Sequence, residues 1–292
     1  MNPPERPRRR VDLRAVWALM KKEYLDNVRN RWIIALSAIF IVLTLVVSYF
    51  GAAQAGGGTG FQGLMETVVG MTAIAQILVP ILALMISYAA VVGEKERGSI
   101  LLLLSMPITR TETILGKFLG LGAVLLTAVL SGLGIGGAII MAFAGTEGWE
   151  NFLVFLLGAI IFALAFLSIG LLLSSLTKRR GIAMGLAVFV WFFLALLFDL
   201  ILGGILVATG GSFIPTPGEP VTLPDWFFAA ALFNPVEAFS SFAALAFDIT
   251  EPFGFVLELP DFVTLGTTSL SIVLWALIPL GLAFWRFRGQ DL

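Results

Sequence analysis

Long apolar runs alternate with short polar segments along most of this 292-residue chain. A helix that crosses the hydrocarbon core of a bilayer needs about 20 consecutive, mainly apolar residues. Six runs reach that length, and they predict membrane-spanning helices at residues 32–50, 70–92, 118–144, 152–176, 181–207 and 262–284. The pattern therefore predicts an all-α integral membrane protein, with one six-span domain over residues 32–292.

Composition supports the membrane class and removes several kinds of chemistry. Hydrophobic residues make up 59% of the chain and charged residues 13%, against about 25% charged in soluble domains. The chain has no Cys and no His, which excludes disulfides, thiolate nucleophiles, imidazole bases and the commonest zinc and copper ligands. We therefore expect no catalytic residues and no metal site. The net charge of −1 gives no reason to expect nucleic-acid binding.

Basic residues are confined to alternate polar segments. All 18 Lys and Arg residues lie in the N-terminal arm up to residue 31, in the segments 93–117 and 177–180, or after residue 284. Positively charged loops stay on the cytoplasmic side of a membrane. The distribution predicts a multi-pass protein of the cytoplasmic membrane with both termini in the cytoplasm.

The N-terminal arm divides into a disordered part, residues 1–10, and a predicted helix over residues 11–31. That helix has apolar side chains at helical spacing and Lys or Arg on its other faces, the apolar set being Val16, Leu19, Met20, Tyr24 and Val28. The pattern predicts an amphipathic helix at the inner membrane surface, attracted to anionic lipids, and a simple soluble anchor is the alternative. Ala53-Gln54-Ala55 resembles a cleavage site, but the arm and the apolar run before it are long for a signal peptide.

The polar segment from 208 to 261 is the largest predicted outer feature. Within it, Asn234, Pro235 and Glu237 fit a helix start, with Asn at the cap, Pro at the first helical position and Glu three residues after the cap. Two short apolar helices are therefore predicted to meet at Asn234. They form either an outer re-entrant lid or an interfacial cover over the bundle.

One acidic residue, Asp199, lies in an apolar span, near the outer end of the fifth one. Acidic groups in hydrocarbon usually face a cavity or a partner. We therefore take Asp199, Asn234, Pro235 and Glu237 as candidates for a substrate path or outer gate. For Glu237, as for Glu66, solvation at the outer surface is the default expectation.

The chain has no phosphate-binding loop of the pattern GxxxxGK[ST]. Its one Gly-Lys pair, Gly116-Lys117, is followed by Phe118 and has Thr111 where the first glycine belongs. Energy for transport must then come from a partner or from an ion gradient. Gly116-xxx-Gly120 and Gly132-xxx-Gly136 also have the spacing that allows another helix to approach closely, although this signal is weak in a chain with 31 Gly.

The segment 93–117 contains an apolar run that is too short to span a membrane. Glu94-Lys95-Glu96-Arg97 is predicted to be a solvated start, Ile100–Leu104 the apolar body of a short helix, and Pro107 its end. Thr109 or Thr111 is the predicted cap of the next helix. A short apolar face exposed at the inner surface implies a protein partner, and a plain interfacial hairpin is the alternative.

This segment resembles the loop of ABC-2 type permeases. The residues that carry the resemblance are Glu94-x-Glu96-x-Gly98-Ser99, the Leu run, Ser105-x-Pro107, Arg110 and Gly116-Lys117-Phe118, although Thr is commoner than Ser at position 99 in that family. The resemblance implies a type V exporter-like fold, a homodimer, and a coupling helix that docks on a separate ATPase subunit, which binds ATP and Mg. No cofactor is then expected in this chain. The implied ATPase-coupling residues are Glu94, Glu96, Arg97, Gly98, Ser99, Leu101, Leu103, Pro107 and Arg110.

Further short matches look most like the NosY-type group of this family. They are Asn30-Arg31-Trp32, Tyr49-Phe50-Gly51, Ile86-x-Tyr88, Phe198-Asp199-Leu200 and Leu232-x-Asn234-Pro235. That group serves maturation of the copper enzyme nitrous oxide reductase, together with a NosF-like ATPase and a periplasmic NosD-like protein. A sulfur cargo or mechanical drive of the periplasmic partner is then expected. Three alternatives stay open: a generic exporter of drug, lipid or ion, a gradient-driven carrier or channel, and a scaffold that transports nothing.

Overall fold

A computed structural model describes residues 12–54, 60–98, 108–211, 223–249 and 259–288, and these form helices joined by short turns. The helices are α1 (Leu13–Val28), α2 (Arg31–Gln54), α3 (Leu64–Ser87), α4 (Val92–Glu96), α6 (Arg110–Val129), α7 (Ile135–Ala144), α8 (Trp149–Leu176), α9 (Arg180–Phe192), α10 (Phe198–Ala208), α11 (Asp225–Ala231), α12 (Pro235–Ala246) and α13 (Leu265–Arg288). Two π-helical turns, η1 (Leu130–Gly134) and η2 (Phe193–Leu197), join α6 to α7 and α9 to α10.

Six helical segments among the described residues are long and apolar enough to cross a membrane. They are Ile33–Gly51, Leu64–Glu96, Arg110–Ala144, Trp149–Leu176, Arg180–Ala208 and Leu265–Arg288. The predicted six-span architecture is therefore confirmed. The second and third segments begin earlier than predicted, at Leu64 and Arg110, because the flanking turns continue directly into the helix.

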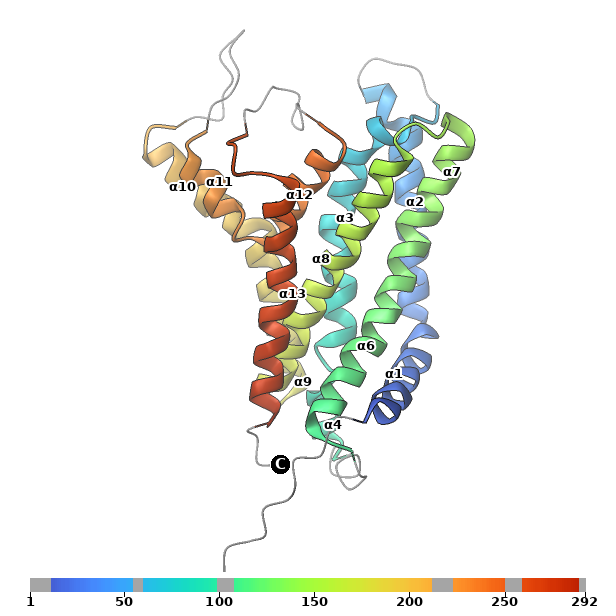
Figure 1. Ribbon diagram of the computed structural model, residues 1–292, viewed down its shortest axis with the longest axis vertical. Coiled ribbons are helices and arrows are strands. Elements are labelled where there is room, and N and C mark those ends of the chain that lie inside the picture. Colours follow the sequence, from blue (N-terminus) through green and yellow to red (C-terminus); the bar gives the residue numbers. More distant parts are fainter. Residues whose placement is uncertain (1–11, 55–59, 99–107, 212–222, 250–258, 289–292) are drawn as a thin grey trace, which may run out of the picture.

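Helix α8 forms the centre of the bundle, and α3, α6, α12 and α13 pack around it (Figure 1). Its buried side chains include Phe155, Phe162 and Phe166, and the ring of Phe162 stacks on Phe239 of α12 at 4.5 Å. The fifth span, α9–η2–α10, lies at the edge of the bundle (Figure 1) and buries few side chains. It is therefore the span with the least packing to restrain its position.

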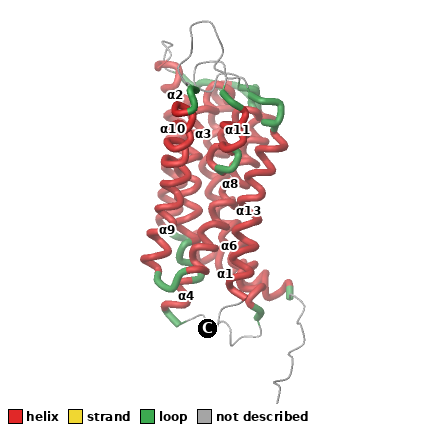
Figure 2. The backbone as a smooth tube through the Cα atoms, turned by 90° about the vertical axis from the view of Figure 1, so that its left-hand side faces the viewer, coloured by secondary structure: helices red, strands yellow, loops and turns green. Residues whose placement is uncertain are grey.

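Different helices lie at the two ends of the elongated bundle (Figures 1 and 2). Helix α1, helix α4 and the last turn of α13 lie together at one end. We call this the basic end, because the Lys and Arg residues of the described chain lie on segments that meet there. The far end carries the start of α11, the end of α12 and the beginning of α13.

Helix α1 packs closely against α6 because two glycines of α6 leave room for it. A Cβ atom at Gly116 would lie 2.5 Å from Leu19 Cβ, and one at Gly120 would lie 2.7 Å from the Met20 carbonyl oxygen. The other predicted glycine pair faces α2, since a Cβ at Gly132 would lie 2.8 Å from Phe40 Cβ. Both spacings singled out in the sequence therefore sit at close helix contacts.

Candidate functional site

The central residues of the segment 93–117 lie outside the described residues, namely Ser99, Leu101, Leu103 and Pro107. The structure describes the flanks on both sides, which hold the other candidate coupling residues, Glu94, Glu96, Arg97, Gly98 and Arg110. The first flank is helix α4, and the second is the start of α6. Each flank is attached to several spans, as the following contacts show.

Helix α4 is anchored to the end of α8. The backbone N–H groups of Val91 and Val92 both donate to Ser174 Oγ at 3.0 Å, and Ser174 is fully buried. Lys95 Nζ donates to the Ser175 carbonyl oxygen at 3.1 Å. A single hydroxyl therefore accepts both backbone donors at the entry to α4.

Helix α4 is also attached to the start of the fifth span. The backbone N–H of Arg180 donates to Glu96 Oε1 at 2.7 Å, and Arg180 Nη2 donates to the Gly93 carbonyl oxygen at 3.4 Å. The exposed Arg97 donates from Nε to the same Gly93 carbonyl at 3.1 Å, and Gly98 ends the helix with a φ of +71°, where glycine is favoured. Glu96 therefore caps α9, a role that the sequence did not reveal.

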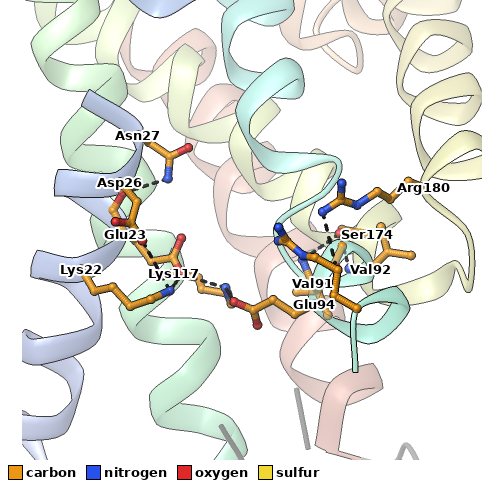
Figure 3. Close-up of polar contacts among 12 residues, drawn as sticks. Lys22, Glu23, Asp26, Asn27, Val91, Val92, Glu94, Lys117, Ser174 and Arg180 are labelled. Atoms are coloured by element: carbon orange, nitrogen blue, oxygen red, sulfur yellow. Dashed lines mark hydrogen bonds and ion pairs between the residues drawn. The ribbon is translucent and has the colours of Figure 1, made fainter. Parts of the chain in front are cut away.

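A buried ion cluster joins α4 to α6 and α1 (Figure 3). Lys117 Nζ donates to Glu23 Oε1 at 2.8 Å and to Glu94 Oε1 at 2.7 Å. The side chains of Lys117, Glu23 and Glu94 are 2%, 9% and 12% exposed. The prediction that Glu94 belongs to a solvated start is wrong, because Lys117 neutralises it in the interior.

The second flank is fixed by the capping box that begins α6. Thr109 accepts from the Glu112 N–H at 3.2 Å, and Glu112 Oε2 accepts from the Thr109 N–H at 2.7 Å, so of the two predicted caps Thr109 is confirmed. The other oxygen of Glu112 accepts from the Asp12 N–H at 2.6 Å, just before α1. Arg110 donates to the Arg288 carbonyl at 3.1 Å, which satisfies an end of α13.

At the far end, α11 and α12 meet at an angle of 110°. Asn234 caps α12 as predicted, with its side-chain oxygen accepting from the Val236 N–H at 3.0 Å, and Pro235 occupies the first helical position. Asn234 Nδ2 also donates to the Leu194 carbonyl in η2 at 2.7 Å, and Asn234 is fully buried. This residue therefore connects the α11–α12 pair to the fifth span.

Helix α13 satisfies the carbonyl groups of the turn between α11 and α12. Trp275 Nε1 donates to the Phe233 carbonyl at 3.0 Å, and the Ser271 hydroxyl donates to the Leu232 carbonyl. Trp275 lies ten residues into α13, or about 15 Å along the helix at 1.5 Å per residue. Non-helical backbone at such a depth requires protein partners for its polar groups, and this turn has them.

Asp199 and Glu237 form a second contact between the fifth span and α12. Their carboxyl groups lie close enough to interact electrostatically. Asp199 is otherwise exposed, and Glu237 is half-buried. The default of a solvated Glu237 is therefore wrong, whereas Glu66 is exposed as expected.

An apolar groove of about 610 Å³ runs along α13 beside α11. Phe233, Leu270, Trp275 and Leu282 are among the side chains that line it, and Ser271 contributes a hydroxyl. The candidate gate residues Asp199, Asn234 and Glu237 do not line this groove.

Comparison with known proteins adds the family. Residues 17–292 match the family model described as ABC-2 family transporter protein. The chain belongs to the ABC-2 transporter permease family. Two relatives of this permease carry the name "Probable ABC transporter permease protein NosY". The relative from Pseudomonas aeruginosa is 36% identical, and the match covers 95% of this chain and 99% of the relative. The relative from Stutzerimonas stutzeri is 34% identical, and the match covers 94% of this chain and 98% of the relative.

Sequence reasoning missed several residues that hold the flanks of the segment 93–117. The sequence drew attention to Lys117 only in its pair with Gly116 and in the family motif, and Ser174 and Arg180 were not singled out. A local signal existed for Glu23, because it continues the buried stripe of Val16 and Leu19 on α1. An acidic residue on an otherwise apolar stripe indicates a buried partner.

Proposed function

We propose that this permease is the membrane subunit of an ABC transporter of the NosDFY type, energised by a separate NosF-like ATP-binding subunit that docks at residues 94–110. The names of its relatives and its family membership support the assignment. The observation that carries the docking proposal is the anchoring of both flanks of that segment. Force applied between Glu94 and Arg110 reaches α1, α6, α8, α9 and α13 through the hydrogen bonds described above.

The basic end faces the cytoplasm in this proposal. Positively charged segments stay on that side, and α1, α4 and the last turn of α13 all lie there. Both termini are then cytoplasmic, and the protein resides in the inner membrane. Helix α1 rests at the inner surface, with Leu13 and Trp17 exposed toward the lipid headgroups.

The fifth span transmits the motion to the far end. Its cytoplasmic end is held by Glu96 of α4, and its outer half is held by Asn234 and Glu237 of α12. Because little else packs against this span, displacement of α4 tilts it with modest disruption of the core. The α11–α12 pair then moves as the outer gate that the sequence suggested.

Two copies of the permease and two ATPase subunits form the working unit, with ATP and Mg bound by the partner and no cofactor in this chain. A periplasmic NosD-like protein receives cargo or force at the far end. Strong copper ligation by this chain is disfavoured by its lack of Cys and His. A sulfur species, or mechanical drive of the periplasmic partner, fits the residues better.

Co-purification with the co-expressed ATPase tests the docking site. The double variant Arg97→Glu with Leu103→Asp is expected to lose the ATPase, because it reverses one exposed charge and places another on the apolar run. The matched control is Lys21→Glu, which reverses an exposed charge on α1 at the same end. Equal recovery of the ATPase with the double variant and with the control would overturn the proposed docking site.

A gradient-driven carrier is the second candidate, and the proximity of the Asp199 and Glu237 carboxyl groups is the observation that favours it. Intramembrane carboxyl groups are the usual carriers of protons in transporters. This candidate predicts flux through the permease alone in proteoliposomes, abolished by Asp199→Asn. The ATPase-driven permease predicts no such flux without its partner.

A further inference from the structure

The buried cluster of Lys117, Glu23 and Glu94 has a geometry that stability alone does not explain. Its three side chains come from α6, α1 and α4, and the two partners of Lys117 lie 94 and 23 residues away in the sequence. A buried ion cluster is a weak source of stability, because apolar side chains of similar volume stabilise an interior at least as well. Such a cluster does, however, fix the relative position of the elements that supply it.

A second lysine lies beside the cluster. Lys22 Nζ lies 3.5 Å from Glu23 Oε1 and 3.6 Å from Asp26 Oδ2. Lys22 is half exposed, whereas Lys117 is almost fully buried. The bonds of Lys117 are short and charge-assisted, and the side chain of Lys117 is only 2% exposed. A displacement of Glu94 is therefore carried to Lys117 and Glu23.

The cluster lies at a close contact between α1 and α6. Gly120 is three residues beyond Lys117, and its missing side chain allows the Met20 backbone of α1 to contact α6 directly. Glu112 adds a second link, from the start of α6 to the backbone just before α1. Helix α1 and the first turns of α6 therefore form one rigid unit, and Lys117 attaches that unit to α4.

Besides its hydrogen bonds to α8, helix α4 has two separate connections to the rest of the membrane domain. The Lys117 branch, made of Lys117 and Glu23, leads to α1 and α6. The Arg180 branch, made of Arg180 and Glu96, leads to α9 and the fifth span. The two branches share α4 and no other helix, which allows each to be cut without the other.

We propose that Lys117 is a positioning residue that transmits the ATPase-driven displacement of α4 to α1 and the first turns of α6. The proposal rests on the proposed docking of an ATPase at residues 94–110. It gives the amphipathic helix α1 a direct mechanical role. In this proposal α1 moves when the nucleotide state of the ATPase changes, in addition to lying on the membrane surface.

Hydrogen–deuterium exchange on the permease–ATPase complex separates the two branches. Exchange is measured in α1 and at the start of α9, with no nucleotide and with ATP and vanadate to trap the ATPase. The test variant is Lys117→Met with Glu94→Gln, which preserves net charge and leaves Glu23 its partner Lys22. A second variant, Glu94→Met, removes the α4 acceptor of Lys117, keeps the Lys117–Glu23 pair and serves if the first does not fold.

The matched control is Lys21→Met with Asp26→Asn, which makes the same change of charge at two exposed positions of α1. In the unaltered permease and the control, trapping is expected to change exchange in both α1 and α9. In the test variants, the change in α1 is lost and the change in α9 remains.

Two results would overturn the proposed role of Lys117 and leave the docking proposal intact. In the first, the change in exchange of α1 persists in the test variants. In the second, exchange in α1 of the unaltered permease does not change although exchange in α9 does. An ATPase that does not bind, or that binds without a response in either helix, would instead overturn the proposed function.

Discussion

Asn234 makes two hydrogen bonds, and two substitutions at this position distinguish their contributions. Its oxygen caps α12 through the Val236 N–H at 3.0 Å, and its nitrogen donates to the Leu194 carbonyl of the fifth span at 2.7 Å. Asn234→Ala removes both. Loss of the cap costs about 1 kcal/mol, and loss of a buried hydrogen-bond donor to Leu194 costs about 1–3 kcal/mol. The sum is a loss of about 2–4 kcal/mol of unfolding free energy.

Asn234→Ser is the matched variant, because serine is also a good N-cap. Serine has no side-chain amide, so it lacks the group that donates to the Leu194 carbonyl. It is expected to lose only the connection to the fifth span. In thermal unfolding in detergent, the melting temperature is expected to fall from the wild type to the Ser variant and again to the Ala variant. Hydrogen exchange is expected to rise in η2 for both variants and at the start of α12 only for Ala. Unchanged exchange in η2 of the Ser variant would refute the role of Asn234 as a connection to the fifth span.

Three further predictions concern single residues. Gly120→Ala is expected to push α1 away from α6 and to destabilise the protein by about 1–3 kcal/mol through overpacking. A Cβ at Gly185 would meet no atom within 4 Å, so Gly185→Ala is expected to stabilise the protein by up to about 1 kcal/mol. Equal melting temperatures of the two variants would contradict this. Ser174→Ala leaves two buried backbone N–H groups without their acceptor, so α4 amides are expected to exchange faster, and unchanged exchange there would count against the anchor. Glu237→Gln keeps a polar side chain beside Asp199 and is expected to preserve transport, whereas Glu237→Leu is expected to reduce it. Equal transport by the two variants would argue against the contact.

The number and order of the spans follow from hydropathy, because a bilayer imposes the same length and polarity on every crossing helix. The predicted N-caps Thr109 of α6 and Asn234 of α12 are also confirmed. A cap can be predicted locally because it depends on residues only a few positions away. Span ends were less accurate. The third span was expected from residue 118, but it starts at Arg110 because the capped helix continues without a break into the apolar run.

Contacts between distant segments could not be read from the sequence. Glu94 looks like a solvated residue beside Lys95 and Glu96, and only folding brings Lys117 and Glu23 to it. The glycine spacing of α6 indicated a close approach, but α1 as the approaching helix depends on tertiary structure. Likewise, the link from Asn234 to the fifth span requires the position of that span, which periodicity does not specify.

The coupling role of the basic end is the central claim, and site-specific photocrosslinking tests it most directly. The chain has no Cys, so a benzophenone maleimide can be attached to a single introduced cysteine, either Arg97→Cys at the exposed end of α4 or Asp261→Cys at the exposed far end. We predict that the label at position 97 crosslinks the ATPase subunit and that the label at position 261 does not. A crosslink from position 261 with none from position 97 would contradict both the docking site and the orientation in the membrane.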